Sequence, residues 1–284
     1  MSQPALTPLK ELLTLVFYSG LLIGANPLSV LIAGYSGGGK TTQLLDPFYR
    51  HQGNHNPGVH RSNHNTRVGL ARFLFNGNLW QLLHHIIIPD LGACLAGPKA
   101  SAFNFLGFIN SLCEDGITDI HTLNIAHLNL TRPAVIAIAT TITFDSLELW
   151  ALPMFQMGVL RRFLPISFTY TEEQDVSNKW VKGLGRLPSN PKIALDYSKS
   201  RSITTIGIPD EIAQVSIELG DKIQNSRFIA TVTQRRQYDY GYIGVIRTLL
   251  MASAIEQGRN VVTYWDAERI VRLSQWMNFD GNSL

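Results

Sequence analysis

The stretch VLIAGYSGGGKTTQLL, residues 30–45, decides the fold. Its first four residues are apolar and largely β-branched, which favours a buried strand, and its last residues continue as a helix. Between strand and helix lies the pattern G-x-x-x-x-G-K-T, met by Gly34, Gly39, Lys40 and Thr41. A strand before this pattern and a helix after it are the context that a phosphate-binding loop requires. The sequence therefore predicts an α/β fold with a nucleotide-binding loop at the end of its first strand.

The residue types in this loop match the chemistry of a nucleoside triphosphate. Glycines let backbone N–H groups turn toward an anion without steric cost. The lysine would reach the outer phosphates, and the Thr41 hydroxyl would coordinate Mg²⁺. We expect ATP and Mg²⁺ as cofactors, held by Gly34, Ser36, Gly37, Gly38, Gly39, Lys40, Thr41 and Thr42.

Composition narrows the class of protein. The chain has 284 residues, of which 45% are hydrophobic and 16% are charged, as in ordinary globular proteins. A net charge of +3 is too small by itself to indicate a nucleic-acid binder. Cys94 and Cys113 fit neither a metal motif nor a disulfide framework, so we expect a reducing, cytoplasmic location. The apolar segment 12–24 is too short to span a bilayer, and we expect a buried helix and no membrane partner.

Apolar strand-like and helix-like segments alternate after the loop, which predicts a parallel sheet. Strands are expected within 83–90, 133–141 and 158–170, a helix over 98–113, and a β-hairpin over 117–130. A segment rich in Ser, Lys, Asn and Pro follows near residues 175–202, and the chain beyond it reads as helical. We therefore expect an N-terminal helix at 1–25, a nucleotide-binding core at 26–175 and a mainly helical lid at 176–284.

The order of these parts resembles the AAA+ ATPases, and among them the minichromosome maintenance (MCM) helicase group. KTTQLL resembles that group's phosphate loop and following helix, and NSLCEDGITDIHTLN resembles the segment that leads into its pre-sensor hairpin. VIAIATT resembles the strand that ends in the first sensor, GVLRRFLPIS the arginine-finger segment, and VVTYWDAERIVRL a helix of the C-terminal lid.

The resemblance implies further site residues. Thr140 falls at the first sensor, where the group usually has Asn, and Arg162 falls at the arginine finger, which would act on a neighbouring subunit's nucleotide. An alternative is that Arg162 is a surface arginine beside Arg161. Arg247 is a candidate for the second sensor, with Arg235 and Arg236 as competitors.

The acidic strand departs from the family pattern. Hydrolysis calls for one acid near Mg²⁺ and a second that activates water. LHHIIIPDLG supplies only Asp90, as a magnesium ligand together with Thr41 or as the base. Glu114 and Asp115 on the next element are possible substitutes, and slow hydrolysis is expected.

The histidines of this chain can be explained without a DNA contact, a zinc site or a catalytic role. The segment 117–130 contains His121 and His127 but no Lys or Arg, so that strand-gripping contact with DNA phosphates is in doubt. His51, His55, His60 and His64 fall in one Asn- and Gly-rich segment, which suits a polar surface loop better than a zinc site. His84 and His85 are expected to be packed rather than catalytic.

We expect an ATP-binding and ATP-hydrolysing protein of the AAA+ kind that assembles into a homo-oligomer, as a ring or a filament, and acts on DNA as a helicase, loader or remodeller. The alternative is a nucleotide-gated regulator or scaffold that assembles with ATP and recruits a protein partner with little turnover. The lone acid favours the second, and the arginine-finger segment and hairpin favour the first.

Overall fold

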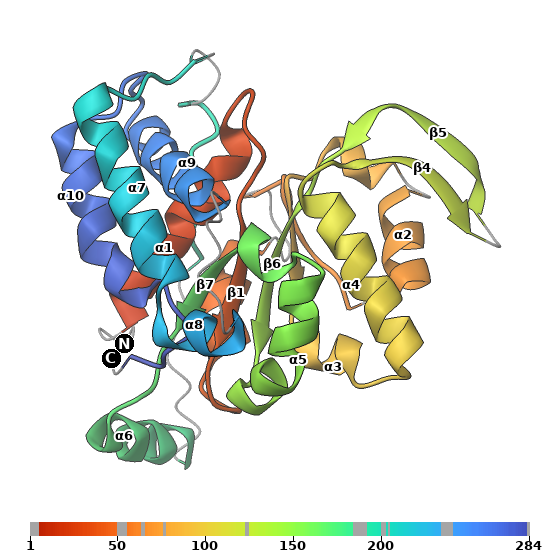
Figure 1. Cartoon of the computed structure of the whole chain (residues 1–284), viewed down its shortest axis with the longest axis horizontal. Helices are drawn as coiled ribbons and strands as arrows, with labels where there is room; N and C mark the ends of the chain where they lie inside the picture. Colours follow the sequence, from red (N-terminus) through yellow and green to blue (C-terminus); the bar gives the residue numbers. More distant parts are fainter. Residues whose placement is uncertain are drawn as a thin grey trace.

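A parallel five-stranded sheet lies at the centre of the molecule, with strand order β2-β3-β6-β1-β7 (Figure 1). A computed structural model describes residues 6–49, 56–63, 66–75, 78–122, 125–183, 192–199, 203, 205–233 and 241–282. The strands are β1 (Ser29–Ala33), β2 (Val59–Arg61), β3 (His85–Ile88), β6 (Ala137–Ile142) and β7 (Phe163–Ser167). β1, β3, β6 and β7 are buried at every residue, because a parallel sheet is covered on both faces. The predicted α/β fold with a parallel sheet is confirmed.

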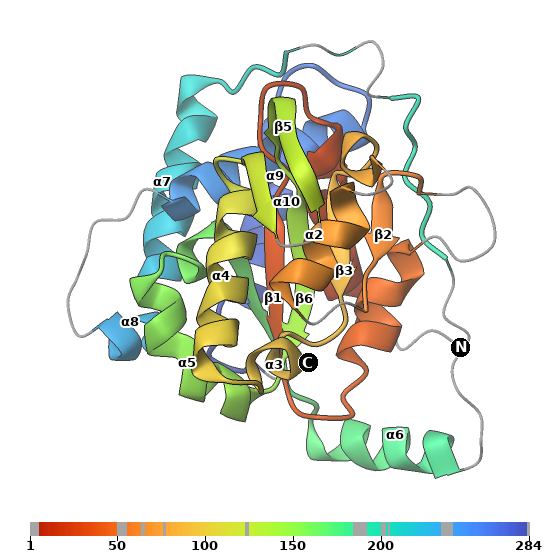
Figure 2. The ribbon, with the colours of Figure 1, turned by 90° about the vertical axis from the view of Figure 1, so that its right-hand side faces the viewer.

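Helices cover both faces of the sheet. One layer holds α2 (Arg67–Phe75), α3 (Leu91–Leu95), α4 (Lys99–Cys113) and α5 (Phe144–Gln156) (Figure 2). The other holds α1 (Thr7–Tyr18), α7 (Asp210–Gln224), α9 (Gly241–Glu256) and α10 (Tyr264–Leu273). The alternation of side chains along β1 divides the core accordingly. Leu31 and Ala33 face the first layer, whereas Val30 and Ile32 face the second.

Short elements complete the chain. The turns of 3₁₀ or π helix are η2 (Ser19–Leu21), η3 (Lys40–Leu45), η4 (Asp46–Phe48), η5 (Leu79–Gln81), η6 (Leu160–Arg162) and η7 (Ser274–Trp276). Two more α-helices are α6 (Glu172–Gly183), which projects from the body beyond the carboxyl end of β7, and α8 (Arg227–Thr233), which lies against α5.

The parallel register brings the ends of three strands to one edge. Ala33 of β1 pairs with Ile142 of β6, and Ile88 of β3 pairs with Thr140 of β6. The segments that follow β1, β3 and β6 therefore leave the sheet side by side, and β6 separates the strand of the glycine-rich loop from the strand that precedes Asp90.

Of the two outer strands of the sheet, β2 is short and β7 is covered. β2 has three residues. β7 contains Pro165, which has no N–H to offer an additional strand, and the backbone N–H of Thr169 just beyond it donates to the carbonyl of Asn282 at 2.8 Å. These features protect both edges against pairing with another chain.

The predicted β-hairpin is confirmed and is longer than expected. Strand β4 (Ile117–Thr122) pairs antiparallel with β5 (Ile125–Ala134), and this ribbon projects from the layer of α2 and α4 (Figures 1 and 2). Because β5 continues to Ala134, it includes Arg132, whose guanidinium lies 5.7 Å from the centre of the Trp80 ring. The strand expected within 133–141 is β6, and it accordingly begins at Ala137 rather than at residue 133.

The histidine-rich segment is not entirely a loop, which corrects one prediction. Its residues 59–61 form β2, because they can extend the sheet beside β3, and α2 begins at Arg67. The side chain of His60 lies between two aromatic rings, with its centre 5.7 Å from that of Tyr49 and 4.9 Å from that of Phe73. His51, His55 and His64 lie outside the described residues.

The C-terminal part is mainly helical in its described residues, as predicted. α7, α9 and α10 share one buried core with α1 and with the β1 and β7 strands, so they form a layer on the sheet. The helix α6 crosses residue 175, where we expected the core to end. Within the described residues, no helix is both long enough and apolar enough to cross a membrane.

Candidate functional site

The glycine-rich loop follows β1 at the carboxyl edge of the sheet, as its pattern predicts. Gly37 and Gly39 have φ angles of 75° and 78°, in the left-handed region that favours glycine. A Cβ on Gly39 would in addition lie 2.9 Å from the Cγ of Gln43. The glycines at these two positions are therefore required by the shape of the loop. Ser36 is exposed at the turn of the loop, and Thr42 lies in the first turn of η3.

Lys40 folds back over this loop. Its Nζ donates to the carbonyl oxygens of Gly34 at 2.6 Å and Tyr35 at 2.7 Å. Burial lowers the pKa of Lys40 to about 8, although the nearby Asp90 carboxylate raises it. Among the described residues, the hydrogen bonds of the ammonium group go to these neutral carbonyls, and a phosphate oxygen would be a stronger, charge-assisted partner for it.

Two threonine hydroxyls meet beside the loop. Thr41 Oγ1 and Thr141 Oγ1 donate to the carbonyl oxygen of Pro89 at 2.8 and 2.6 Å, and the two hydroxyl oxygens are 3.4 Å apart. This arrangement joins the ends of β1, β3 and β6 at one point. Thr141 was not singled out from the sequence. The alternation of a strand was the signal that could have found it, since only one of two adjacent threonines can face the loop.

Thr140, the residue expected at the first sensor, faces the opposite side of β6 from Thr141. It is completely buried, and its Oγ1 has no hydrogen-bond partner among the described residues. The hydroxyl that reaches the phosphate-loop threonine is therefore that of Thr141.

Asp90 follows β3 and Pro89, and it is exposed. Its Oδ1 accepts a hydrogen bond from the N–H of Gly92 at 2.9 Å, which caps the start of α3. The Thr41 hydroxyl bonds the carbonyl of the preceding Pro89, and the Asp90 carboxylate lies near enough to Lys40 to raise its pKa. Mg²⁺ prefers oxygen ligands and retains several waters, so this pair fits the ion when a triphosphate supplies further oxygens.

The helix after the loop is unusually short. η3 has six residues in the wide π geometry, with the N–H of Asp46 donating to the carbonyl of Thr41, and Pro47 follows. A short helix contributes only a small dipole, so an anion here would depend mainly on Lys40 and the loop amides. π turns are frequent at functional sites.

Arg162 lies at the opposite edge of the sheet. It directly precedes β7, whose first residue pairs with the first residue of β1. Its guanidinium donates to the carbonyl of Gly158 at 2.7 Å and forms a salt bridge with Glu114. An arginine in this position cannot reach the phosphate loop of its own chain.

Glu114 is therefore not a second acid for the site in its own chain, which corrects one alternative. Its carbonyl accepts a hydrogen bond from the side chain of Asn26, just before β1. It lies at the amino edge of the sheet because α4 runs from the carboxyl edge back to the start of β1. Asp90 stands at the other edge.

Arg247 lies on an exposed side of α9. The start of this helix is tied to the segment that carries Arg162, because Tyr242 Oη donates to the carbonyl of Leu160 at 3.1 Å. The competing residues Arg235 and Arg236 lie outside the described residues.

His84 and His85 are packed in the interior, at the start of β3. Their Nδ1 atoms are 2.6 Å apart, His84 Nε2 is 3.3 Å from Tyr197 Oη, and His85 Nε2 is 3.0 Å from the carbonyl of Leu28.

No family model matches the chain, and no curated protein matches its sequence.

Proposed function

We propose that this chain binds ATP with Mg²⁺ at the loop of residues 34–41. The observation that supports this most is the position of Lys40, whose ammonium is held in the loop by two carbonyl oxygens. Binding would exchange these neutral partners for phosphate oxygens, which carry charge. The adjacent hydroxyls of Thr41 and Thr141 and the carboxylate of Asp90 supply polar groups at the same edge.

Each residue would have a separate task in hydrolysis. Thr41 and Asp90 would hold the metal. When bound, the metal would offset the negative charge of the transferring phosphoryl group. Thr141 would place its hydroxyl near the outer phosphate. Because the segment that follows β3 supplies only Asp90, the water would be oriented rather than strongly activated, and we expect slow turnover.

We further propose that the core is of the AAA+ kind and that copies assemble head to tail, as a ring or filament acting on DNA. β6 lies between β1 and β3, a hairpin is inserted just before β6, and the C-terminal part is helical. The distance between the two edges of the sheet separates Arg162 from its own loop, so one copy would offer the loop and the next copy the arginine. Arg247, close to the same edge through α9, would be a second sensor.

The alternative function is a nucleotide-gated scaffold that recruits a protein partner. Its support is the salt bridge between Arg162 and Glu114, which occupies the guanidinium within its own chain. The modest charge of the hairpin points in the same direction, since Arg132 rests on Trp80 at the hairpin base.

Calorimetric titration with Mg²⁺ and ATP tests the binding proposal. We expect Lys40→Ala to lose binding by at least about 10-fold to 100-fold, because a charged hydrogen-bond donor is removed. Lys199→Ala is the matched control, since Lys199 Nζ also donates to a backbone carbonyl, that of Glu256 at the end of α9, at 2.6 Å. Equal affinity of the Lys40→Ala and wild-type proteins would refute the assignment of the loop.

Phosphate release with and without single-stranded or duplex DNA separates the two functions. Stimulation by DNA supports the DNA-acting ATPase, whereas ATP-dependent assembly without appreciable turnover supports the scaffold. A chain that stays monomeric at high concentration with Mg²⁺ and ATP would contradict both.

A further inference from the structure

Tyr170, which lies three residues beyond the end of β7, contacts the phosphate loop. Tyr170 Oη donates to the carbonyl oxygen of Gly38 at 2.8 Å, across a sequence separation of 132 residues. The ring of Tyr170 packs at right angles to that of Phe168, with 5.6 Å between the centres. Tyr170 is therefore oriented by its own segment before it meets the loop.

The same segment approaches the loop at a second point. A Cβ on Gly34 would lie 3.3 Å from the carbonyl oxygen of Phe168, closer than most side-chain contacts. Gly34 and Gly38 thus mark the beginning and the middle of the loop, and residues 168–170 contact it near both.

Gly38 lies between the two glycines with positive φ, Gly37 and Gly39. Its N–H donates to the carbonyl of Tyr35 at 3.3 Å, and its carbonyl is held by Tyr170. With both sides of this residue fixed, the peptide planes of its neighbours have less freedom to rotate. Their N–H groups, which would contact phosphate, then need less ordering on binding.

We propose that Tyr170 is a positioning residue for the phosphate loop, whose hydroxyl sets the loop in the shape that accepts a phosphate chain. This inference rests on the proposed nucleotide site and names a residue that the glycine-rich pattern does not contain. Burial raises the pKa of Tyr170 to about 12, so the hydroxyl remains a donor throughout the neutral range.

Tyr170→Phe tests this role because it removes the hydroxyl and keeps the ring. We expect the dissociation constants of Mg–ATP and Mg–ADP to rise by about 3-fold to 10-fold, the usual effect of one lost hydrogen bond. Where turnover is measurable, KM should rise while kcat changes little, because the hydroxyl does not touch the reacting atoms.

Tyr197→Phe is the matched control. Tyr197 is also half-buried, and its Oη accepts from the N–H of Gly58 at 3.3 Å, in the layer beside β2. Its loss should affect unfolding but leave nucleotide affinity unchanged.

Hydrogen exchange of the nucleotide-free protein gives an independent readout. In Tyr170→Phe the amides of residues 36–40 should exchange faster, whereas those of β1 should not change. Wild-type affinity together with wild-type loop exchange in Tyr170→Phe would overturn the inference, even when Lys40→Ala abolishes binding. Failure of the wild-type protein to bind ATP would instead overturn the proposed function.

Discussion

At the carboxyl end of β6, two adjacent threonines have opposite surroundings. The hydroxyl of Thr141 meets Thr41 and Pro89, whereas the hydroxyl of Thr140 is buried without a partner among the described residues. A buried hydroxyl without a hydrogen bond costs free energy, and a hydroxyl beside the phosphate loop is available for chemistry.

Substituting each threonine by the equally sized valine separates these roles. We expect Thr141→Val to lower ATP turnover by at least about 10-fold, because a polar group near the outer phosphate is lost. Thr140→Val should keep turnover and leave the free energy of unfolding unchanged or raise it by up to about 1 kcal/mol. Phosphate release and urea unfolding measure both. The reverse pattern would return the first sensor to Thr140.

His84 and His85 form a chain of hydrogen bonds that cannot be completed when both rings are protonated, because the two Nδ1 atoms would then both be donors. The Leu28 carbonyl requires a proton on His85 Nε2, so His85 Nδ1 accepts from His84 Nδ1, and His84 Nε2 accepts from Tyr197. The space for His84 exists because Gly20 and Gly58 lack side chains, since a Cβ on either would overlap its ring.

Acid should therefore destabilise the protein through this pair. Burial lowers the pKa of His84 to about 4 and that of His85 well below its usual value of 6.5. The unfolded chain takes up protons first, so stability is full above pH 6.5 and falls as the pH drops toward 4. Between pH 6.5 and 5 we expect a loss of about 2 kcal/mol per histidine.

Urea unfolding at several pH values measures this loss. Asn replacements at both positions, which cannot gain a proton, should flatten the curve between pH 6.5 and 5. A curve that is equally steep in the variant would assign the effect to other groups.

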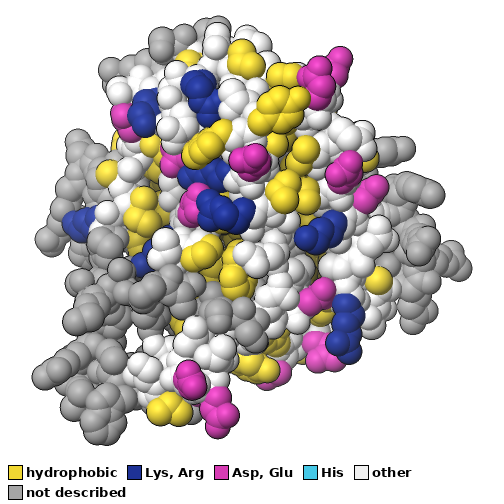
Figure 3. Space-filling view, turned by 90° about the vertical axis from the view of Figure 1, so that its left-hand side faces the viewer, with side chains coloured by type: hydrophobic (Ala, Val, Ile, Leu, Met, Phe, Trp, Pro, Cys, Tyr) yellow, Lys and Arg dark blue, Asp and Glu magenta, His cyan; other side chains and the backbone are white. Residues whose placement is uncertain are grey.

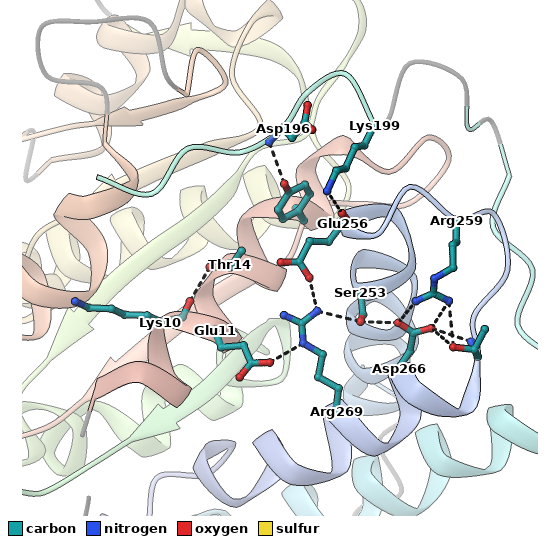
Figure 4. Close-up of polar contacts among 12 residues, drawn as sticks. Lys10, Glu11, Thr14, Asp196, Lys199, Ser253, Glu256, Arg259, Asp266 and Arg269 are labelled. Carbon is teal, nitrogen blue, oxygen red and sulfur yellow. Dashed lines mark hydrogen bonds and ion pairs between the residues drawn. The ribbon is translucent and has the colours of Figure 1, made fainter. Parts of the chain in front are cut away.

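At the scale of the helices, a buried ion network joins α1, α9 and α10 (Figure 4). Arg269 of α10 pairs with Glu11 of α1 at 2.7 Å and with Glu256 of α9. Arg259 pairs with Asp266, which also accepts from the hydroxyl of Ser253 at 2.6 Å. Asp266 accepts from the N–H of Thr263 at 2.8 Å as well, which caps the start of α10.

Two arginines of α10 share Glu11 but differ in burial, and this allows a matched comparison. The Arg269 side chain is 8% exposed and the Arg272 side chain 55%. Arg269→Ala removes the arginine partner of Glu256 and leaves Glu11 with Arg272 alone, and it should cost roughly 3–5 kcal/mol of unfolding free energy. Arg272→Ala should cost less than about 1 kcal/mol, as surface pairs do. Equal losses in urea unfolding would contradict the difference in burial.

At the scale of the whole molecule, the sheet separates two edges of different chemistry. The carboxyl edge carries the loop and Asp90, and the amino edge carries Arg162 with Glu114. The outer surface of the α7–α10 layer shows apolar side chains interspersed with charges of both signs (Figure 3). Among the described residues, the features that suit a nucleotide and an arginine finger thus lie at opposite edges.

Mixing variants tests whether these edges meet between copies. Arg162→Ala subunits keep the loop, and Asp90→Ala subunits keep the arginine, so each should turn over ATP slowly alone. A mixture should exceed the sum of the two, because some junctions then contain both groups. Phosphate release from mixtures at several ratios measures this, and no gain on mixing would refute action across subunits.

Two further variants separate catalysis from structure. Arg161→Ala, a neighbour with the same charge, should leave turnover unchanged. Glu114→Gln removes the salt-bridge partner of Arg162 within the same chain and leaves the positive charge of Arg162 in place. Turnover should therefore be retained or increased. If turnover falls to the level of Arg162→Ala, the salt bridge is structural and the arginine is not a finger.

The local parts of this protein could be predicted from the sequence alone. The glycine pattern, the apolar strands, the helix over 99–113 and the hairpin were predictable, because periodicity and turn residues act within a few positions of the chain. Lys40, Thr41 and Asp90 are candidate site residues on the same kind of local signal, since each belongs to a short segment next to a strand.

The contacts between residues far apart in the chain could not be predicted and are seen in the folded molecule. The fold selected Thr141 over Thr140 as the contact of Thr41, placed Glu114 at the far edge of the sheet, brought Tyr170 to Gly38, and packed the C-terminal helices against α1. The physical reason is that strand order and register fix these contacts through the burial of a shared core, and neither is encoded in the spacing of neighbouring residues.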